Sequence, residues 1–297
     1  MEIHDGVMEF PGVKALDQVN FTLMPGECHA LVGENGAGKS TLSKCITGEN
    51  QMTKGDLVIK GEKIKIPAYN VRESQKRGVA IVHQEFTLMG DMTGVENIFV
   101  GRYEKKHGHI NWKALDKSAK ELLEYMQCDV NLNIPVKHLR TAERQIIQLA
   151  KALLDDPKIL ILDEPTAGLD PKERAYFRNI IAEMSKDKII IISTHIVSDI
   201  EYISDQVLIM KKGKFILQGP ADELLKEVKN EVWSCRVPNN QWSNFERTHC
   251  IANSHVMKEV IEARVISTSS PIEGAIIVEP TLEDLYLKLF SDELQEG

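Results

Sequence analysis

The sequence lacks a cysteine pattern, a long apolar run and a secretory leader, and each absence excludes a class of protein. Its five cysteines show no CxxC spacing, so neither a zinc knuckle nor a disulfide framework is predicted. No apolar run approaches the roughly 18 residues of a membrane span. The N-terminus carries Glu2 and Asp5 instead of the basic-then-apolar pattern of a secretory signal. These features favour free thiols and a cytoplasmic protein.

Basic residues are also in the minority. The 297 residues include 36 Lys and Arg against 44 Asp and Glu, which gives a formal net charge of −8. Proteins that wrap nucleic acid usually present a net basic face, so we expect no nucleic-acid partner. Hydrophobic residues (42%) and charged residues (27%) occur in ordinary globular proportions. The length suits one large domain with an accessory region.

The chain begins with short strand-like runs and continues with a helical region. Val19 to Leu23 and Cys28 to Val32 read as strands, and a hairpin is predicted around Gly61-Glu62. From about residue 89 to 155 the pattern becomes helical. Five apolar residues there recur on one helix face: Leu115, Ala119, Leu122, Leu123 and Met126. We interpret this stripe as packed helix core and the region as a helical subdomain.

Signals of buried strands return after the helical region. Ile159 to Leu162 and Lys188 to Ile192 are continuous apolar runs, as buried parallel strands require. Helix-compatible sequence follows each run, over residues 172–185 and 197–203. This alternation predicts an α/β fold with a mostly parallel core sheet, an antiparallel β subdomain and the helical subdomain.

The C-terminal part of the chain follows a weaker pattern. We predict a main domain over residues 1–225 and a small α+β accessory region over residues 226–297. Just before the boundary, the lysines of Lys211-Lys212-Gly213-Lys214 are interpreted as a solvated hairpin tip. Trp233, Trp242 and Phe245 are interpreted as a small local core.

A phosphate-binding motif lies between a predicted strand and a predicted helix. Gly33-x-x-x-x-Gly38-Lys39-Ser40 is the Walker A pattern, in which glycines let backbone N–H groups surround phosphates at a helix N-terminus. Lys39 would reach the β- and γ-phosphates, and the Ser40 hydroxyl would coordinate Mg²⁺. The pattern therefore predicts a P-loop NTPase fold that binds a nucleotide.

Two carboxylates end the next buried strand. Asp163 and Glu164 follow Ile159-Leu160-Ile161-Leu162, at the sheet edge where open α/β sheets bind ligands. Asp163 would hold Mg²⁺ through water, and Glu164 would act as general base on the attacking water. In isolation the pair would be equally compatible with an acidic surface turn, but the Walker A motif favours the site.

In this order the motifs resemble those of an ATP-binding cassette (ABC) transporter ATPase, over about residues 3 to 225. Phe10 is similar to the aromatic residue that stacks on adenine, and Gln84 to the glutamine that links Mg²⁺ and the nucleophilic water to the permease. Asp170 resembles the aspartate that crosses the dimer interface, and His195 the histidine that contacts the γ-phosphate. Alone, Phe10 and His195 read as structural residues and Gln84 as a surface amide. Their order and spacing favour the family.

The resemblance implies a complete set of site residues. Catalysis is expected from Glu164, His195 and Gln84, and Mg²⁺ coordination from Ser40, Gln84 and Asp163. Contacts with ATP are expected from Phe10, Gly33, Asn35, Gly36, Ala37, Gly38, Lys39, Ser40, Thr41, Arg140 and Asp170. In the family, two cassettes sandwich two ATP molecules and drive separate transmembrane permease subunits. We therefore expect a second cassette, a permease, and a cytoplasmic location that is peripheral to the inner face of the membrane.

The signature segment departs from the family pattern. Leu139-Arg140-Thr141-Ala142-Glu143 stands 24 residues before Asp163, where the family has Leu-Ser-Gly-Gly-Gln. Arg140 is long and charged where a small hydroxyl is usual. An arginine can itself bind phosphate, so we expect hydrolysis to be reduced and not abolished. The alternative is a weakly hydrolysing partner in a heterodimer. A soluble ABC protein acting on ribosomes or DNA is disfavoured by the acidic composition.

The two halves of the chain resemble different branches of the family. Residues up to about Leu154, with Phe10-Pro11-Gly12-Val13-Lys14 and Val82-His83-Gln84-Glu85, are similar to monosaccharide importers. From Asp163 onward, Ser193-Thr194-His195 with its following residues and Glu279-Pro280-Thr281-Leu282 are similar to exporter ATPases. We hypothesise a recombined chain joined near residues 150–160, so these motifs leave the direction of transport open.

Overall fold

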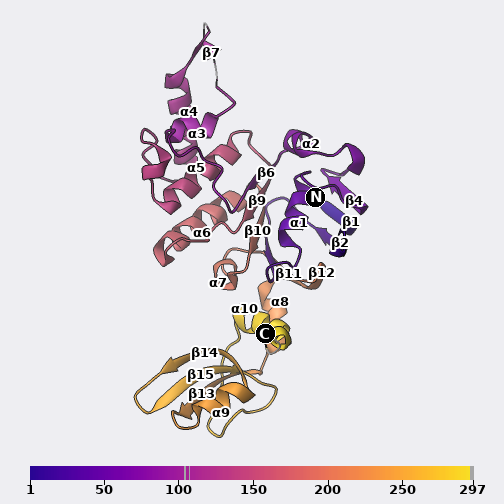
Figure 1. Cartoon of the computed structure of the whole chain (residues 1–297), viewed down its shortest axis with the longest axis vertical. Helices are drawn as coiled ribbons and strands as arrows, with labels where there is room; N and C mark the ends of the chain where they lie inside the picture. Colours follow the sequence, from indigo (N-terminus) through magenta and orange to yellow (C-terminus); the bar gives the residue numbers. More distant parts are fainter. Residues whose placement is uncertain (104, 107, 295–297) are drawn as a thin grey trace. The chain divides into compact units, whose positions relative to one another are not determined.

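The computed structural model describes residues 1–103, 105–106 and 108–294, and the chain divides into two compact units (Figure 1). The first unit spans residues 1–218 and the second residues 219–297; the predicted boundary lies between 225 and 226. Within the described residues, no helix has the length and apolarity needed to cross a membrane.

A six-stranded sheet forms the centre of the first unit. Its order is β12 (Lys214–Gly219), β11 (Gln206–Lys211), β3 (Cys28–Val32), β10 (Ile189–Thr194), β9 (Ile159–Asp163) and β6 (Val79–Val82). The strands from β11 to β6 run parallel to one another. Every residue of β3 and β10 is buried, which explains the apolar runs over residues 30–32 and 189–192. The mostly parallel core sheet is confirmed.

An antiparallel sheet accompanies the central sheet. It has the order β2 (Val13–Thr22), β1 (Glu2–Phe10), β4 (Lys54–Ile59) and β5 (Glu62–Lys63), and its last two strands form the predicted hairpin. Leu57 and Ile59 of this sheet belong to one hydrophobic cluster with Leu42 of helix α1 (Lys39–Ile46) and Ile161 of β9. Burial of these apolar residues fixes the antiparallel subdomain against the central sheet.

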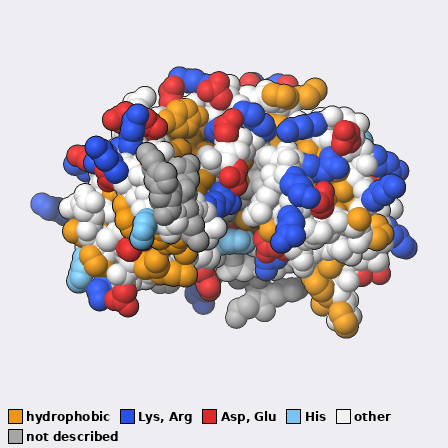
Figure 2. Space-filling view, turned by 90° about the horizontal axis from the view of Figure 1, so that it is seen from above, with side chains coloured by type: hydrophobic (Ala, Val, Ile, Leu, Met, Phe, Trp, Pro, Cys, Tyr) orange, Lys and Arg blue, Asp and Glu red, His pale blue; other side chains and the backbone are white. Residues whose placement is uncertain are grey.

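The helical subdomain contains α3 (Gly94–Phe99), α4 (Trp112–Tyr125) and α5 (Thr141–Leu153). On α4 and its C-terminal cap, Leu115, Ala119, Leu123 and Met126 of the predicted stripe are buried, whereas Leu122 is half-buried. A short hairpin of β7 (Lys105–Lys106) and β8 (His109–Ile110) lies between α3 and α4 and was not expected. Charged side chains of both signs are interspersed over the face shown in Figure 2, with hydrophobic side chains in small groups.

The remaining helices of the first unit include α2 (Val71–Lys76), α6 (Pro171–Ser185) and α7 (Val197–Ile200), with the 3₁₀ turns η1 (Ile66–Ala68) and η2 (Val136–His138). The prediction of a helix over residues 197–203 is wrong in its length, because α7 ends at Ile200 and residues 201–203 form a turn.

The second unit is a small α+β structure. Its sheet has the order β14 (Cys250–Val256), β15 (Val260–Ile266), β13 (Val232–Pro238) and β16 (Ile276–Ile277), all antiparallel. Its helices are α8 (Ala221–Leu224), the 3₁₀ turn η3 (Leu225–Val228), α9 (Trp242–Thr248) and α10 (Leu282–Leu294). Phe245 is buried beside Cys235 and Val237, with Trp233 and Trp242 packed against them, which confirms the predicted local core.

Candidate nucleotide site

The phosphate loop joins the end of β3 to the start of α1, as the sequence predicts. Two of its glycines are required by close backbone approaches. A Cβ at Gly33 would lie 2.3 Å from the carbonyl oxygen of Met210, and one at Gly38 would lie 2.5 Å from that of Ala15. Gly38 also has a φ of 111°, a conformation that other residues avoid. The loop is therefore held tightly between β2 and β11.

Lys39 begins α1 and folds back over this loop. Its ammonium group donates hydrogen bonds to the carbonyl oxygens of Gly33 at 2.7 Å and Glu34 at 3.1 Å, and the residue is buried. Burial lowers the pKa of Lys39 from its usual value, although the carboxylates of Glu164 and Asp163 act in the opposite direction. A buried cation at a helix N-terminus suits phosphate binding.

Ser40 and Asp163 meet beside Lys39. The hydroxyl of Ser40 lies 3.4 Å from Oδ2 of Asp163, although the two residues are 123 positions apart in sequence. Asp163 is the last residue of β9, so its side chain stands at the carboxyl edge of the sheet. A hydroxyl and a carboxylate are the oxygen ligands that Mg²⁺ prefers in proteins, and this pair fits that ion.

Glu164 follows Asp163 and is held by the neighbouring strand β10. One carboxylate oxygen lies 2.9 Å from Nδ1 of His195, and the other accepts a hydrogen bond from the Thr194 hydroxyl at 3.2 Å. The N–H of Glu164 donates to the carbonyl oxygen of Ser193 at 2.8 Å. Its φ of 48° places the backbone in the left-handed region, which costs of order 1–3 kcal/mol for a non-glycine residue. The neighbouring contacts fix this strained, buried carboxylate.

A cavity of about 370 Å³ opens over the phosphate loop. It brings together Asn35, Gly36, Gly38, Lys39, Ser40, Thr41, Gln84 and Glu164, all named by the sequence analysis. Five further residues line it that carry no predicted site role: Val13, Lys14, Ala15, Lys212 and Gly213.

The interpretation of Lys212 and Gly213 as a solvated hairpin tip is incomplete. The turn does connect β11 to β12 and Lys212 is exposed. The N–H of Gly213, however, donates to the carbonyl oxygen of Ala37 in the phosphate loop at 2.9 Å. The turn reaches the loop because β11 lies beside β3 and parallel to it. The sequence of the turn does not show which strands become neighbours, so this contact could not be predicted from it.

Seven predicted residues do not line the cavity: Phe10, Gly33, Ala37, Arg140, Asp163, Asp170 and His195. Asp163 and His195 instead contact Ser40 and Glu164, which do line it. Phe10 ends β1, is 41% exposed, and pairs across the β1–β2 turn with Val13, which does line it. Arg140 precedes α5, with its side chain 76% exposed and its Nε 3.4 Å from Oε2 of Glu143. Asp170 caps α6 by accepting a hydrogen bond from the N–H of Glu173 at 2.8 Å.

The segments that carry Arg140 and Asp170 approach each other within the chain. A Cβ built at Gly168 would lie 4.0 Å from Cγ2 of Thr141. Gly168 precedes Asp170 by two positions, and Thr141 follows Arg140 directly. The signature segment and the turn after Glu164 are therefore neighbours.

Comparison with known proteins matches residues 16–167 to the family model described as ABC transporter. That stretch holds the phosphate loop, Gln84, Arg140 and the Asp163-Glu164 pair. The chain belongs to the ABC transporter family.

Two relatives of this ABC cassette are named for sugar import. It is 39% identical over 250 residues to the xylose import ATP-binding protein XylG of Thermoanaerobacter pseudethanolicus, covering 83% of this chain and 48% of that protein. It is 38% identical over 221 residues to the ribose import ATP-binding protein RbsA of Caldanaerobacter subterraneus subsp. tengcongensis, covering 74% of this chain and 44% of the relative. The cassette therefore spans about half the length of these relatives.

The first of these matches bears on the hypothesis of a recombined chain. A match over 83% of the cassette must cross residues 150–160, where we placed the junction, so the hypothesis is not confirmed.

Among solved structures, the ADP conformation of MJ1267, an ATP-binding cassette of an ABC transporter, superposes with a TM-score of 0.66. It is 25% identical and covers 77% of this chain and 94% of that one. This neighbour is consistent with the P-loop fold class.

Proposed function

We propose that this cassette binds and hydrolyses ATP and thereby energises a separate membrane permease from the cytoplasmic side. The observation that carries the proposal is the arrangement around Glu164. The buried Glu164 carboxylate lines the same cavity as Lys39 and the phosphate loop, and it contacts His195. Family membership supplies the reaction class, phosphoryl transfer from ATP to water.

Nucleotide binding is assigned to the loop and its surroundings. The N–H groups of residues 33–41, including Ala37, would surround the phosphates, and Lys39 would neutralise their charge. Phe10 would stack on adenine at the end of the cavity lined by Val13. Ser40, Asp163 and Gln84 would hold Mg²⁺, which when bound neutralises charge on the transferred phosphoryl group.

Hydrolysis is assigned to Glu164 and His195. The Glu164 carboxylate would orient the attacking water and take its proton. His195 would contact the γ-phosphate while its ring orientation is kept by Glu164. Positioning dominates phosphoryl transfer, so the fixed geometry of this pair supports the proposal.

A second cassette is expected to complete the site. Arg140 and Asp170 lie outside the cavity of their own chain, and the resemblance assigns both to contacts across a cassette dimer. The exposure of Arg140 is compatible with that role. The dimer would consist of two copies of this chain or of this chain with a related cassette.

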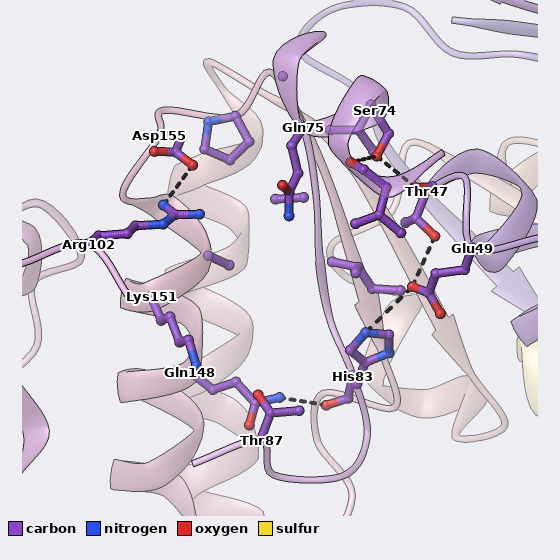
Figure 3. Close-up of a pocket in the computed structure, with 17 residues that line it drawn as sticks. Thr47, Glu49, Ser74, Gln75, His83, Thr87, Arg102, Gln148, Lys151 and Asp155 are labelled. Atoms are coloured by element: carbon purple, nitrogen blue, oxygen red, sulfur yellow. Dashed lines mark hydrogen bonds and ion pairs between the residues drawn. The ribbon is translucent and has the colours of Figure 1, made fainter. Parts of the chain in front are cut away.

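A second cavity, shown in Figure 3, is the surface that we propose for the permease. It measures about 320 Å³ and separates α5 from α2. Arg102 and Asp155 form an ion pair at 2.6 Å on the α5 side, and His83 lies 3.6 Å from Glu49 on the other. Gln148 donates to the carbonyl oxygen of His83 at 2.8 Å. Because His83 precedes Gln84, a partner seated here would be linked to the nucleotide site.

Arg140 favours a second candidate function, a nucleotide-binding partner with little turnover. Steady-state MgATP hydrolysis over a range of protein concentrations, with Glu164→Gln as the blank, separates the two. Turnover that rises with concentration and vanishes in the blank supports the working enzyme. ATP binding without turnover supports the second candidate. Because the relatives are named for xylose and ribose import, a monosaccharide is the first cargo class to assay.

A further inference from the structure

A second bridge joins the two segments that carry Glu164 and His195. The hydroxyl of Thr166 donates a hydrogen bond of 2.6 Å to Oδ2 of Asp199, and both residues are buried. Thr166 lies two positions after Glu164, and Asp199 lies on α7, four positions after His195. The same two segments are thus joined once at the nucleotide site and again behind it.

Asp199 is anchored from a third segment as well. Its Oδ1 lies 3.5 Å from Nη1 of Arg178 on α6, which also donates to the carbonyl oxygen of Ser198 at 3.4 Å. A buried carboxylate is costly unless it is paired and hydrogen-bonded. The position of the Asp199 carboxylate is therefore tightly specified, and so is the position of the Thr166 hydroxyl that donates to it. Helix α6 begins directly after Asp170, so the bridge also reaches the segment expected at the dimer interface.

Thr166 belongs to the turn that keeps Glu164 in its strained backbone conformation. The N–H of Ala167 donates to the carbonyl oxygen of Glu164 at 3.1 Å, and that of Leu169 donates to the carbonyl oxygen of Thr166 at 3.2 Å. The Thr166 hydroxyl is the side-chain tie between this turn and α7. Loss of this hydrogen bond would remove the connection behind the nucleotide site and loosen the turn against α7.

We infer that Thr166 and Asp199 are positioning residues that keep His195 in register with Glu164 during ATP hydrolysis. The inference rests on the proposed ATPase function for its kinetic consequence. Neither side chain lines the nucleotide cavity, so the pair acts through the turn and α7. Removal of this hydrogen bond therefore reduces kcat and leaves MgATP binding intact. A displacement of His195 from Glu164 by about 1 Å would slow a reaction that depends on their positions.

The kinetic test compares Thr166→Val, which lacks the donor, and Asp199→Ala, which lacks the acceptor, with Thr166→Ser, which keeps the hydroxyl. Tyr69→Phe is the matched control, because the buried Tyr69 hydroxyl makes a hydrogen bond of the same length, 2.6 Å, to the carbonyl oxygen of Ile46 outside the site. We expect kcat to fall about tenfold or more in the first two variants, with KM and MgATP affinity unchanged and near wild-type kcat in Thr166→Ser. Unchanged kcat in Thr166→Val and Asp199→Ala, or an equal loss in Tyr69→Phe, would overturn the inference.

A spectroscopic test does not depend on turnover. The ring nitrogen resonances of His195, assigned with His195→Gln in the full chain, report its tautomer and hydrogen bonding. We expect them to move in Thr166→Val, to return in Thr166→Ser and to stay in place in Tyr69→Phe. Unmoved resonances in Thr166→Val contradict the inference. A wild-type chain without ATP turnover contradicts the proposed function instead, and displaced resonances in Thr166→Val would still support the positioning role.

Discussion

Nδ1 of His195 lies 2.9 Å from Oε1 of Glu164, although 31 positions separate the two residues. They meet because β9 and β10 are parallel neighbours, with Asp163 opposite Ser193 in the register. Each strand ends at the same edge of the sheet, so the residue after Asp163 faces the residues that end β10. The contact orients the imidazole ring and the carboxylate at once, which is the geometry that the proposed hydrolysis requires.

Replacement of Glu164 by Gln tests the proposed base. The amide keeps the shape of the carboxylate but cannot accept a proton, so we expect hydrolysis to fall about 10²-fold or more. MgATP binding should be retained, because Lys39 and the loop are unchanged. Single-turnover hydrolysis and equilibrium binding of MgATP measure the two effects. Full activity in Glu164→Gln would place the base elsewhere.

Replacement of Lys39 by Ala removes the buried cation over the phosphate loop. Charge-assisted contacts of this kind contribute about 1.5–3 kcal/mol, so MgATP affinity should fall about 10- to 100-fold. Lys44→Ala is the matched control, since Lys44 lies on the same helix but is exposed. Calorimetric titration with MgATP checks both variants. Equal affinities in the two would contradict the assignment of the loop.

Arg140→Ser restores the small hydroxyl that the family has in the signature. A serine at this position can also cap α5, which now begins after a residue that is a poor N-cap. We expect turnover to rise about tenfold, because misplacement of a group in a positioned reaction can lower the rate by this factor or more. Concentration-dependent MgATP hydrolysis provides the measurement, with Arg140→Gln as the charge-removing control. A fall in both variants would show that the arginine itself contacts phosphate.

Asp156 makes a pH-dependent contribution to the folding stability of the chain. Hydrogen bonds from Lys158 and Lys188 lower the pKa of Asp156 from 3.8 to about 2. Because the folded-state pKa is the lower one, the stabilisation is fully present above pH 3.8 and is lost as the pH falls toward 2. Asp156→Asn should lower Tm at neutral pH, since the buried Lys188 side chain loses its ion pair. Thermal melts from pH 7 to pH 2 should show the difference in Tm shrinking below pH 4, and a constant difference would refute the assignment.

Asp284 anchors α10 of the second unit. It is 1% exposed, and its two carboxylate oxygens accept from Arg264 at 2.8 and 2.7 Å. Breaking a buried pair costs about 3–5 kcal/mol, so Asp284→Asn should speed amide exchange in α10 markedly. Glu262→Gln breaks the exposed pair with Arg236 and should cost about 0–1 kcal/mol. Hydrogen exchange of the full chain compares the two; equal effects would contradict a structural role for Asp284.

Much of the site could be predicted because its parts are contiguous in sequence. The run from Cys28 to Ser40 specifies a buried strand, a glycine loop and a helix start, all of which depend on local backbone geometry. The run from Ile159 to Glu164 likewise specifies a buried strand with two carboxylates at its end. The helical stripe on α4 was readable from its spacing for the same reason.

Other residues of the site could not be predicted because their position depends on strand order. Lys212 and Gly213 reach the phosphate loop only because β11 lies beside β3, and no local pattern records which strands become neighbours. The β7–β8 hairpin was absorbed into the helical region because each of its strands has only two residues, too few for a period to show.

The sequence by itself determined the chemistry of this cassette, since the types and order of the phosphate-loop and carboxylate residues are local properties. Tertiary structure alone decided the distances. The parallel register of β9 and β10 sets Glu164 against His195, and the packing of α7 sets Thr166 against Asp199. Such contacts join segments about 30 residues apart, and their geometry follows from the packing of the whole sheet and its helices.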